Sequence, residues 1–274
     1  MKDFTVQDWL RTDDQMCVDI VNRKYLLEEE VLGHKETVNE MLDRVSGGNK
    51  KAEQLMRDLK FLPGGRIIAN RGLQKYGIKV TYSNCYVDPA PEDSIEDIYE
   101  TCKRLARTFS YGGGIGIDIS KLAPAGAKVR NTARNSTGAV SFVNTFSEVA
   151  ETIGMKSRRG ALMISIDGKH PDLEKFITHK SDLNITQGAN MSVRMSDDFF
   201  DAVRKDKLWK MEFTRKETGE CIKKTAKARD ILNLIAKTNW DYAEPGLLYW
   251  DTICNYNLMS NDENFSYAGT NPCG

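Results

Sequence analysis

The chain has 274 residues, with 39 basic and 39 acidic side chains and a formal net charge of zero. This balance offers no general basic field for nucleic acid and no acidic tail, and the length suits one large domain or two small ones. No apolar stretch approaches the ~18 residues of a membrane span, and the charged start "MKDFTVQDWL" lacks the apolar region of a signal peptide. The six cysteines are scattered without a CxxC pair, so we expect reduced thiols, a cytoplasmic protein and no structural zinc.

The first sixty residues are highly charged and carry the periodicity of amphipathic helices. The stretch "VNEMLDRVSGGNKKAEQLMRDLKFL" predicts two such helices, separated by Ser46-Gly47-Gly48. Pro63-Gly64-Gly65 predicts a stop, so we place a helical N-terminal region at residues 1–62 and a second region at 63–274. The segments "RIIAN" and "KVTYSNCYV" come next, and their apolar and alternating patterns predict strands.

Predicted strands and helices alternate from about residue 62 onward. Asp93 or Ser94 is well placed to cap a helix over 94–109, and the glycine run "GGGIG" leads from it into the alternating strand "IGIDI". A polar loop and a helix at about 140–154 follow. The later predicted elements are the strand "SRRGALMISIDG", the helix "PDLEKFITHKS", the strand "MSVRM", the helix "SDDFFDAVRK", a β-hairpin in "KLWKMEFTRKETGECIKK", the helix "AKARDILNLIAKTNWDYAEPG", the strand "LLYWD" and an irregular tail. This alternation predicts an α/β architecture with largely parallel strands, as in a barrel or a doubly wound sheet.

The glycine run does not match either common phosphate-binding motif. The GxxxxGK[ST] pattern is absent, and a Rossmann fingerprint requires strand, glycines and helix in that order, whereas here a helix comes first. Three consecutive glycines still allow a ligand to approach the backbone closely, and a tight helix-to-strand connection is the alternative. Arg158 and Arg159 precede a strand and can bind an anion or remain a solvated pair. The three histidines share no metal-ligand spacing, so no metal site is expected.

Two of the cysteines have neighbours that suit chemistry. Cys85 follows Ser83 and Asn84, and Cys273 follows Asn271 and a proline. Small polar residues beside a thiol can orient a substrate hydroxyl. The alternative for each is an inert buried thiol that packs like a small apolar residue.

Several segments, read in order, resemble the large catalytic subunit of ribonucleotide reductase. They are "FLPGGRIIAN", "YSNCYV", "EDSIEDIYE", "GGGIGIDISKL", "STGAVSFVNTFSEVAETI", "RRGALMISIDGKHPDLEKFI", "KSDLNITQGANMSVRMSDDFF", "NWDYAEPGLLYWD" and "NPCG". The match covers roughly residues 60–274 and is most similar to the adenosylcobalamin-dependent (class II) branch. The class I branch, which takes its radical from a second subunit, shares nearly all these motifs and stays open. The resemblance implies the N-terminal half of a ten-stranded α/β barrel, preceded by a small helical region, with a finger loop at its centre.

The resemblance also implies roles for individual residues. Cys273 would become a thiyl radical and take the 3′-hydrogen of the ribose, while Asn271 would hydrogen-bond that ribose. Cys85 would be one of two thiols that reduce the 2′-carbon and end as a disulfide. The remaining implied substrate contacts are Asn84, Gly113 and Gly114. A thioredoxin-like reductant and adenosylcobalamin, contacted mostly outside this chain, are the expected partner and cofactor.

A nucleotide effector site at a homodimer interface is the second implied feature. It would use Asp93, Ser94 and Ile95 at a helix start, and a loop at about 123–137, called Loop 1, that includes Arg130. Loop 2, at about 181–190, would pass the identity of the dNTP or ATP effector to the substrate base, and its Asn184 and Gln187 would bind the effector. The helices at about 94–109 and 140–154 would form the dimer contact.

The family pattern continues "NPC-x-E", and that glutamate, a second reducing cysteine and the rest of the barrel do not occur before Gly274. We therefore expect a complementary C-terminal reductase polypeptide. A split gene, an intein or intron, and a fragmentary reading frame are the origins left open. The alternative function is a nucleotide-binding, dimerising regulatory fragment without catalysis.

Overall fold

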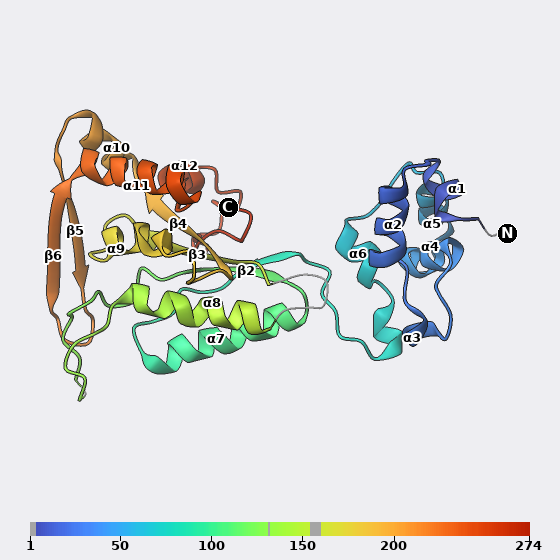
Figure 1. The fold of residues 1–274 in the computed structure, drawn as a ribbon, viewed down its shortest axis with the longest axis horizontal. Helices are drawn as coiled ribbons and strands as arrows, with labels where there is room; N and C mark the ends of the chain where they lie inside the picture. Colours follow the sequence, from blue (N-terminus) through green and yellow to red (C-terminus); the bar gives the residue numbers. More distant parts are fainter. Residues whose placement is uncertain (1–3, 131, 154–159) are drawn as a thin grey trace. The chain divides into compact units, whose positions relative to one another are not determined.

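The structure is a computed structural model that describes residues 4–130, 132–153 and 160–274 (Figure 1). The chain divides into two compact units, Met1–Asn84 and Cys85–Gly274. The sequence placed a boundary after residue 62, so the two divisions differ over residues 63–84. That stretch carries α6 (Gly65–Asn70), whose Ile68 is buried in the core of the first unit.

The first unit is helical. Its helices are α1 (Val6–Leu10), α2 (Gln15–Lys24), α3 (Glu29–Leu32), α4 (Val38–Ser46), α5 (Lys50–Arg57), α6 and the 3₁₀ turn Leu73–Tyr76. Helices α4 and α5 confirm the predicted pair, and Gly47 ends α4 in the left-handed conformation that favours glycine, at φ 62°. The strand predicted for "RIIAN" is wrong: the β-branched pair favoured a strand, but packing of Ile68 against the helical core outweighs that preference.

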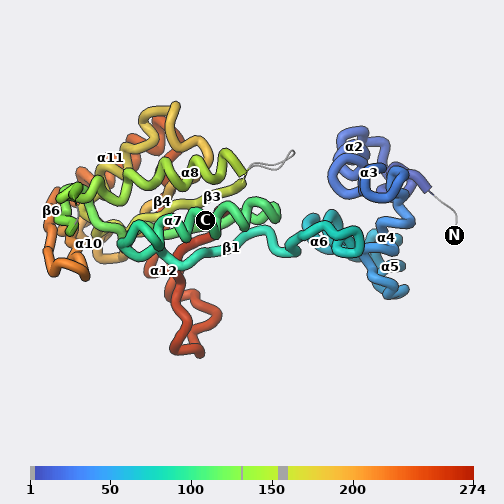
Figure 2. Tube along the Cα trace, turned by 90° about the horizontal axis from the view of Figure 1, so that it is seen from below, coloured from blue at the N-terminus to red at the C-terminus, as the bar shows by residue number. Residues whose placement is uncertain are grey.

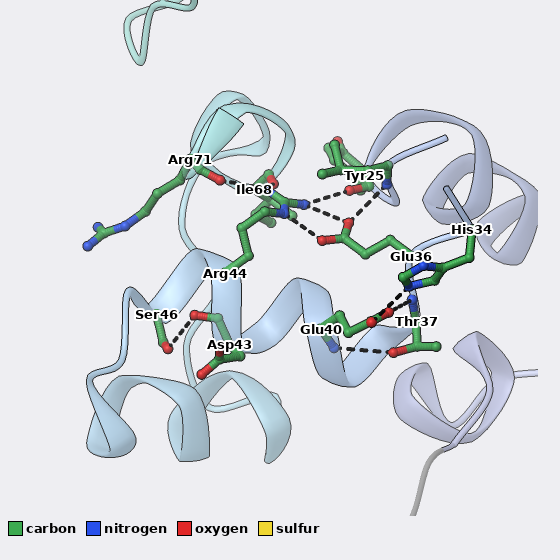
Figure 3. Close-up of polar contacts among 11 residues, drawn as sticks. Tyr25, His34, Glu36, Thr37, Glu40, Asp43, Arg44, Ser46, Ile68 and Arg71 are labelled. Atoms are coloured by element: carbon green, nitrogen blue, oxygen red, sulfur yellow. Dashed lines mark hydrogen bonds and ion pairs between the residues drawn. The ribbon is translucent and has the colours of Figure 1, made fainter. Parts of the chain in front are cut away.

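A buried ion pair holds the first unit together (Figure 3). The Arg44 guanidinium donates to both carboxylate oxygens of Glu36, at 2.6 and 2.9 Å. Its other N–H groups reach the backbone carbonyls of Tyr25, Ile68 and Arg71. The side chains of Arg44 and Glu36 are 8% and 1% exposed, respectively. A charge pair this deeply buried is tolerated only when hydrogen bonds satisfy it fully, and this one joins α4 to α6 and to the end of α2.

The second unit contains a five-stranded sheet in the order β1-β2-β3-β4-β7. The strands are β1 (Cys85–Val87), β2 (Gly114–Asp118), β3 (Leu162–Asp167), β4 (Ala189–Met195) and β7 (Gly246–Tyr249). Every neighbouring pair is parallel. A separate antiparallel hairpin is formed by β5 (Leu208–Thr214) and β6 (Cys221–Lys227). The α/β prediction with parallel strands is thus confirmed, together with the predicted hairpin.

Helices pack on the sheet, and all of them except α12 lie between strands in the chain (Figures 1 and 2). They are α7 (Ile95–Ser110), α8 (Val143–Thr152, after a 3₁₀ turn at Ala139–Phe142), α9 (Leu173–Ile177, followed by the 3₁₀ turn His179–Ser181), α10 (Asp197–Arg204), α11 (Ala228–Tyr242) and α12 (Trp250–Asn255). Helices α7 and α8 contact each other and run side by side (Figure 1). No helix in the described part of the chain is long and apolar enough to cross a membrane.

Two local predictions need comment. Ser94 is the cap of α7, because its side chain accepts the Asp97 backbone N–H at 3.2 Å; Asp93 does not fill that role. The tail predicted to be irregular begins with α12, which the sequence analysis missed because "WDTICN" is too short for a helical period. Helix α8 was expected to extend to residue 154, which lies outside the described residues, as do Arg158 and Arg159.

Candidate functional site

The sheet of the second unit has two chemically different faces. Side chains alternate along each strand, and the parallel register places successive strands in step. One face is apolar and forms the core with the helices; its strand residues are Ile115, Ile117, Leu162, Ile164, Ile166, Met191, Val193 and Met195. The opposite face is mostly small or polar, with Cys85, Gly114, Gly116, Asp118, Ser165, Ser192, Arg194 and Gly246. A site for polar chemistry is therefore expected on this second face, which we call the open face.

The C-terminal segment 269–273 lies along β2 on the open face. A Cβ placed on Gly116 would stand 1.8 Å from the Thr270 carbonyl oxygen, and one on Gly114 would stand 3.1 Å from the Pro272 ring. Gly269 lies near Asp118: a Cβ placed on Gly269 would stand 3.8 Å from the Asp118 Cβ atom. The segment thus runs antiparallel to β2, and the glycines of "GGGIG" leave room for another part of the backbone. The space beside the glycine run is therefore filled by residues 270–272 of the same chain, so the run does more than form a tight helix-to-strand connection.

This arrangement brings Cys85 and Cys273 together at the start of β1. Their Sγ atoms are 3.7 Å apart, within hydrogen-bonding distance for sulfur. Cys273 is exposed and Cys85 is partly exposed. The Asn271 side-chain oxygen accepts the Cys273 backbone N–H at 2.8 Å, which fixes the turn that presents the thiol. Three residues that the sequence singled out therefore meet in space, although 188 positions separate the two cysteines.

Two further predicted substrate contacts, Gly113 and Asn84, have packing or hydrogen-bond partners of their own. A Cβ on Gly113 would be 2.8 Å from the Tyr86 ring and 2.9 Å from the Thr108 methyl group, so Gly113 permits packing against α7. Asn84 ends the first unit, where its side-chain oxygen accepts a hydrogen bond from Arg66 at 3.1 Å. Their substrate-binding roles stay predictions.

A buried polar cluster lies at the other end of the open face, and sequence reasoning did not identify it. The Ser165 hydroxyl donates to Asp118 at 2.7 Å, and the Arg194 Nε lies 3.1 Å from the same carboxylate oxygen as an ion pair. Burial raises the pKa of Asp118, while Arg194 opposes that rise. The guanidinium stacks 4.4 Å from the Trp250 ring centre. The alternation in "GIGID" alone would have placed Asp118 on the same face as Gly116.

Two of the expected effector residues, Asp93 and Ser94, border a separate cavity of about 360 Å³. Its lining is Glu92, Asp93, Ser94, Ser120, Lys121, Phe213, Thr214, Lys216 and Glu217. Asp93 and Ser94 were predicted here, and the residues from the β5–β6 hairpin were not. Ile95 is 55% exposed at the first turn of α7. The cavity therefore joins the start of α7 to the hairpin.

Each of the two predicted effector loops is held by hydrogen bonds to other parts of the second unit or within the loop itself. Asp172 accepts backbone N–H groups from residues 125 and 139, at 3.1 Å each, so it anchors both ends of Loop 1. In Loop 2, Asn184 donates to Asp182 at 3.1 Å and Gln187 donates to the Leu183 carbonyl at 3.2 Å. Arg130 is exposed. Within the described ranges, no hydrogen bond connects Arg130 or these Loop 2 amides to the cavity.

The thiol geometry predicts a selective cross-link. We expect the oxidant diamide to join Cys85 and Cys273 in the folded chain, because their sulfur atoms need only a small movement to reach bonding distance. Each thiol loses one hydrogen and the diazene becomes a hydrazine, so the electrons balance. Peptide mapping by mass spectrometry should find this linkage ahead of any other. Recovery of both thiols in alkylated form, after other exposed cysteines have oxidised, would contradict the geometry, and a Cys85→Ser chain provides the control.

Comparisons with known proteins identify the family to which this fold belongs. The family model "Ribonucleotide reductase, barrel domain" matches residues 83–274. The chain is 36% identical over 224 residues to a vitamin B12-dependent ribonucleoside-diphosphate reductase of Thermoplasma acidophilum, covering 81% of this chain and 28% of that protein. It is 31% identical over 276 residues to one of Mycobacterium tuberculosis (94% and 38%). It is 32% identical over 216 residues to a vitamin B12-dependent ribonucleotide reductase of Streptomyces avermitilis (70% and 22%).

The chain belongs to the ribonucleotide reductase family, since the family model matches more than half of its length. It spans 28% and 38% of the length of the first two relatives. The five parallel strands correspond to part of a barrel domain. In the described part of the chain, no group of three or more His, Cys, Asp or Glu side chains is arranged to hold a metal ion.

Proposed function

We propose that this chain forms the first half of the ten-stranded barrel of a ribonucleotide reductase, an oxidoreductase that converts ribonucleotides to 2′-deoxyribonucleotides. The observation that carries the proposal is the 3.7 Å contact between the Cys85 and Cys273 thiols on the open face. The names of the Thermoplasma and Mycobacterium relatives support ribonucleoside diphosphates as substrates. Because the chain spans only part of those relatives, the activity is proposed for the complete reductase, whose complementary C-terminal part supplies the remaining barrel.

The proposed chemistry assigns one step to each thiol. Cys273, exposed at the tip of segment 269–273, takes the 3′-hydrogen of the ribose and later returns it. Cys85 and a second thiol outside this chain provide two electrons and two protons, so the 2′-hydroxyl leaves as water and the thiols become a disulfide. Asn271 has a side chain that already fixes the Cys273 turn, and it would hydrogen-bond the substrate ribose.

Gly114 and Gly116 support this assignment sterically. Neither has a side chain, so no side chain projects from the open face where segment 269–273 and a ribose would share space. The apolar face is sealed by helices, which leaves the open face as the side from which a substrate would approach. In the complete barrel this face would be enclosed, and exclusion of water would protect the radical.

Adenosylcobalamin is the proposed cofactor, supported by relatives that are named as vitamin B12-dependent. When bound, it supplies the organic radical that starts the reaction. The residues present fit this requirement, because Cys273 is exposed and a thiol gives up a hydrogen atom at modest cost. Cys273 is the residue of this chain that would face the cofactor.

We also propose that the cavity beside α7 binds a dNTP or ATP effector, with Asp93, Ser94 and Loop 1 as its protein contacts. The cavity volume of about 360 Å³ lies in the usual range for small-molecule sites. Helices α7 and α8, which lie side by side, would provide the homodimer contact, and a thioredoxin-like protein would reduce the disulfide. The cytoplasmic location predicted from the sequence stays a prediction.

The test is a product assay on the complete reductase, which includes this chain. Ribonucleoside diphosphates, a dithiol reductant and a dNTP effector are incubated with and without adenosylcobalamin, and deoxynucleotides are measured by chromatography. We expect product only with the cofactor. If dNTPs bind but no deoxynucleotide forms under either condition, the reductase assignment is contradicted in favour of a regulatory role. Cofactor-independent product that requires a second, radical-generating subunit would contradict the adenosylcobalamin assignment alone.

A further inference from the structure

One wall of the cavity beside α7 comes from the β5–β6 hairpin, through Phe213, Thr214, Lys216 and Glu217. Arg215 lies within this run, and its side chain is only 7% exposed. Buried arginines are rare unless their donors are paired. The partners of Arg215 therefore indicate what this part of the hairpin does.

Arg215 contacts the two parts of the proposed effector site at once. Its Nε donates to the Asp93 carboxylate at 2.8 Å, and its Nη1 donates to the Lys128 carbonyl in Loop 1. The other Asp93 oxygen accepts the backbone N–H of Ala123, where Loop 1 begins, at 2.9 Å. Glu217 pairs with the remaining guanidinium nitrogen at 2.9 Å. One planar side chain thus joins the start of α7, Loop 1 and the hairpin.

A second hairpin residue, Glu220, also bonds Loop 1, through the backbone N–H of Lys128 rather than its carbonyl. The Glu220 carboxylate accepts the Lys128 backbone N–H at 2.7 Å. The Glu220 carbonyl in turn accepts the Arg215 backbone N–H at 2.9 Å, which closes the hairpin turn. Both backbone groups of Lys128 are therefore bonded to the hairpin, one through Arg215 and one through Glu220.

We propose that the β5–β6 hairpin is a working part of the effector site and that Arg215 is its positioning residue. An effector that contacts both Asp93 and Loop 1 requires these two groups to keep a fixed separation, and Arg215 is bonded to both. Lysine cannot replace it fully, because only the guanidinium fork directs donors to a carboxylate and a carbonyl together. The inference rests on the proposed effector function of Asp93 and Loop 1.

The experiment measures nucleotide affinity by calorimetry on the full 274-residue chain, with each of the four dNTPs in turn. We expect Arg215→Met to weaken the tightest dNTP at least ~10-fold, because it removes two charge-assisted hydrogen bonds. Arg215→Lys should give an intermediate affinity. Arg204→Met is the matched control: Arg204 is exposed on α10 and pairs with nearby Asp201, so its loss should leave binding unchanged.

Hydrogen exchange separates positioning from general stability. In Arg215→Met, the amides of Ala123 and Lys128 should exchange faster, and a dNTP should no longer slow them, while amides of β2 and β3 keep wild-type rates. If Arg215→Met does not fold, Glu220→Ala tests the same link at Lys128. Wild-type affinity in a folded Arg215 or Glu220 variant would overturn the inference alone. Failure of the wild-type chain to bind any dNTP would instead contradict the effector function, and the inference would fall with it.

Discussion

Gly116→Ala is expected to displace segment 269–273 and to abolish most of the activity of the complete reductase. The added Cβ would lie 1.8 Å from the Thr270 carbonyl oxygen, and a backbone atom cannot swing aside as a flexible side chain does. The segment must therefore move, and Cys273 moves with it. A misplacement of about 1 Å at a reacting group can cost ~10²-fold in rate, so we expect a loss of at least that size.

The matched control is Gly269→Ala in the same segment. A Cβ there would meet its nearest neighbours at 3.8 Å, an ordinary contact distance. Gly269→Ala should retain activity and the diamide cross-link between Cys85 and Cys273, whereas Gly116→Ala should lose both. The apolar face is untouched by either change, so both chains should fold. A Gly116→Ala protein that still cross-links in full yield would show that segment 269–273 does not lie along β2.

Arg44→Met is expected to destabilise the first unit by ~3–5 kcal/mol, the usual cost of leaving one member of a buried ion pair without its partner. The Glu36 side chain is only 1% exposed, and three backbone carbonyls would also lose their donor (Figure 3). The measurement is urea unfolding of the full chain, followed by hydrogen exchange at the backbone amides of α4, which report on this unit alone.

Lys35→Met provides the comparison for Arg44→Met. Lys35 pairs with Glu28 at 2.7 Å, but the two side chains are 42% and 56% exposed. An exposed pair contributes ~0–1 kcal/mol, so this change should hardly shift the unfolding midpoint. Equal midpoints for the two variants would contradict the central place given to Arg44 in the first unit.

Local patterns predicted most of the second unit. Alternating strands, capped helices and the "KLWKMEFTRKETGECIKK" hairpin are encoded within short windows, and their order is sufficient to predict a parallel sheet. Errors arose where distant packing decides. The segment "RIIAN" became α6 because Ile68 joins a helical core, and no short window contains that core.

The candidate site was predictable only in part for the same reason. Local patterns singled out Cys85, Cys273 and Asp93, and the resemblance implied their roles, but the partners of these residues come from far along the chain. Arg215 lies 122 positions from Asp93 and 87 from Lys128. The glycine at position 116 is explained by the carbonyl of Thr270, which no local pattern contains. Contacts of this kind require the three-dimensional arrangement.

Cys273 is the proposed radical-carrying thiol, and a Cys273→Ser substitution in the complete reductase tests that role. A serine hydroxyl holds its hydrogen far more firmly than a thiol, so we predict no deoxynucleotide above background. Cys254→Ser, at an exposed cysteine in α12, is the control and should keep wild-type activity. Unchanged dNTP affinity in both variants would establish that they are folded. Deoxynucleotide formation by Cys273→Ser at the rate of the control would contradict the radical role proposed for Cys273.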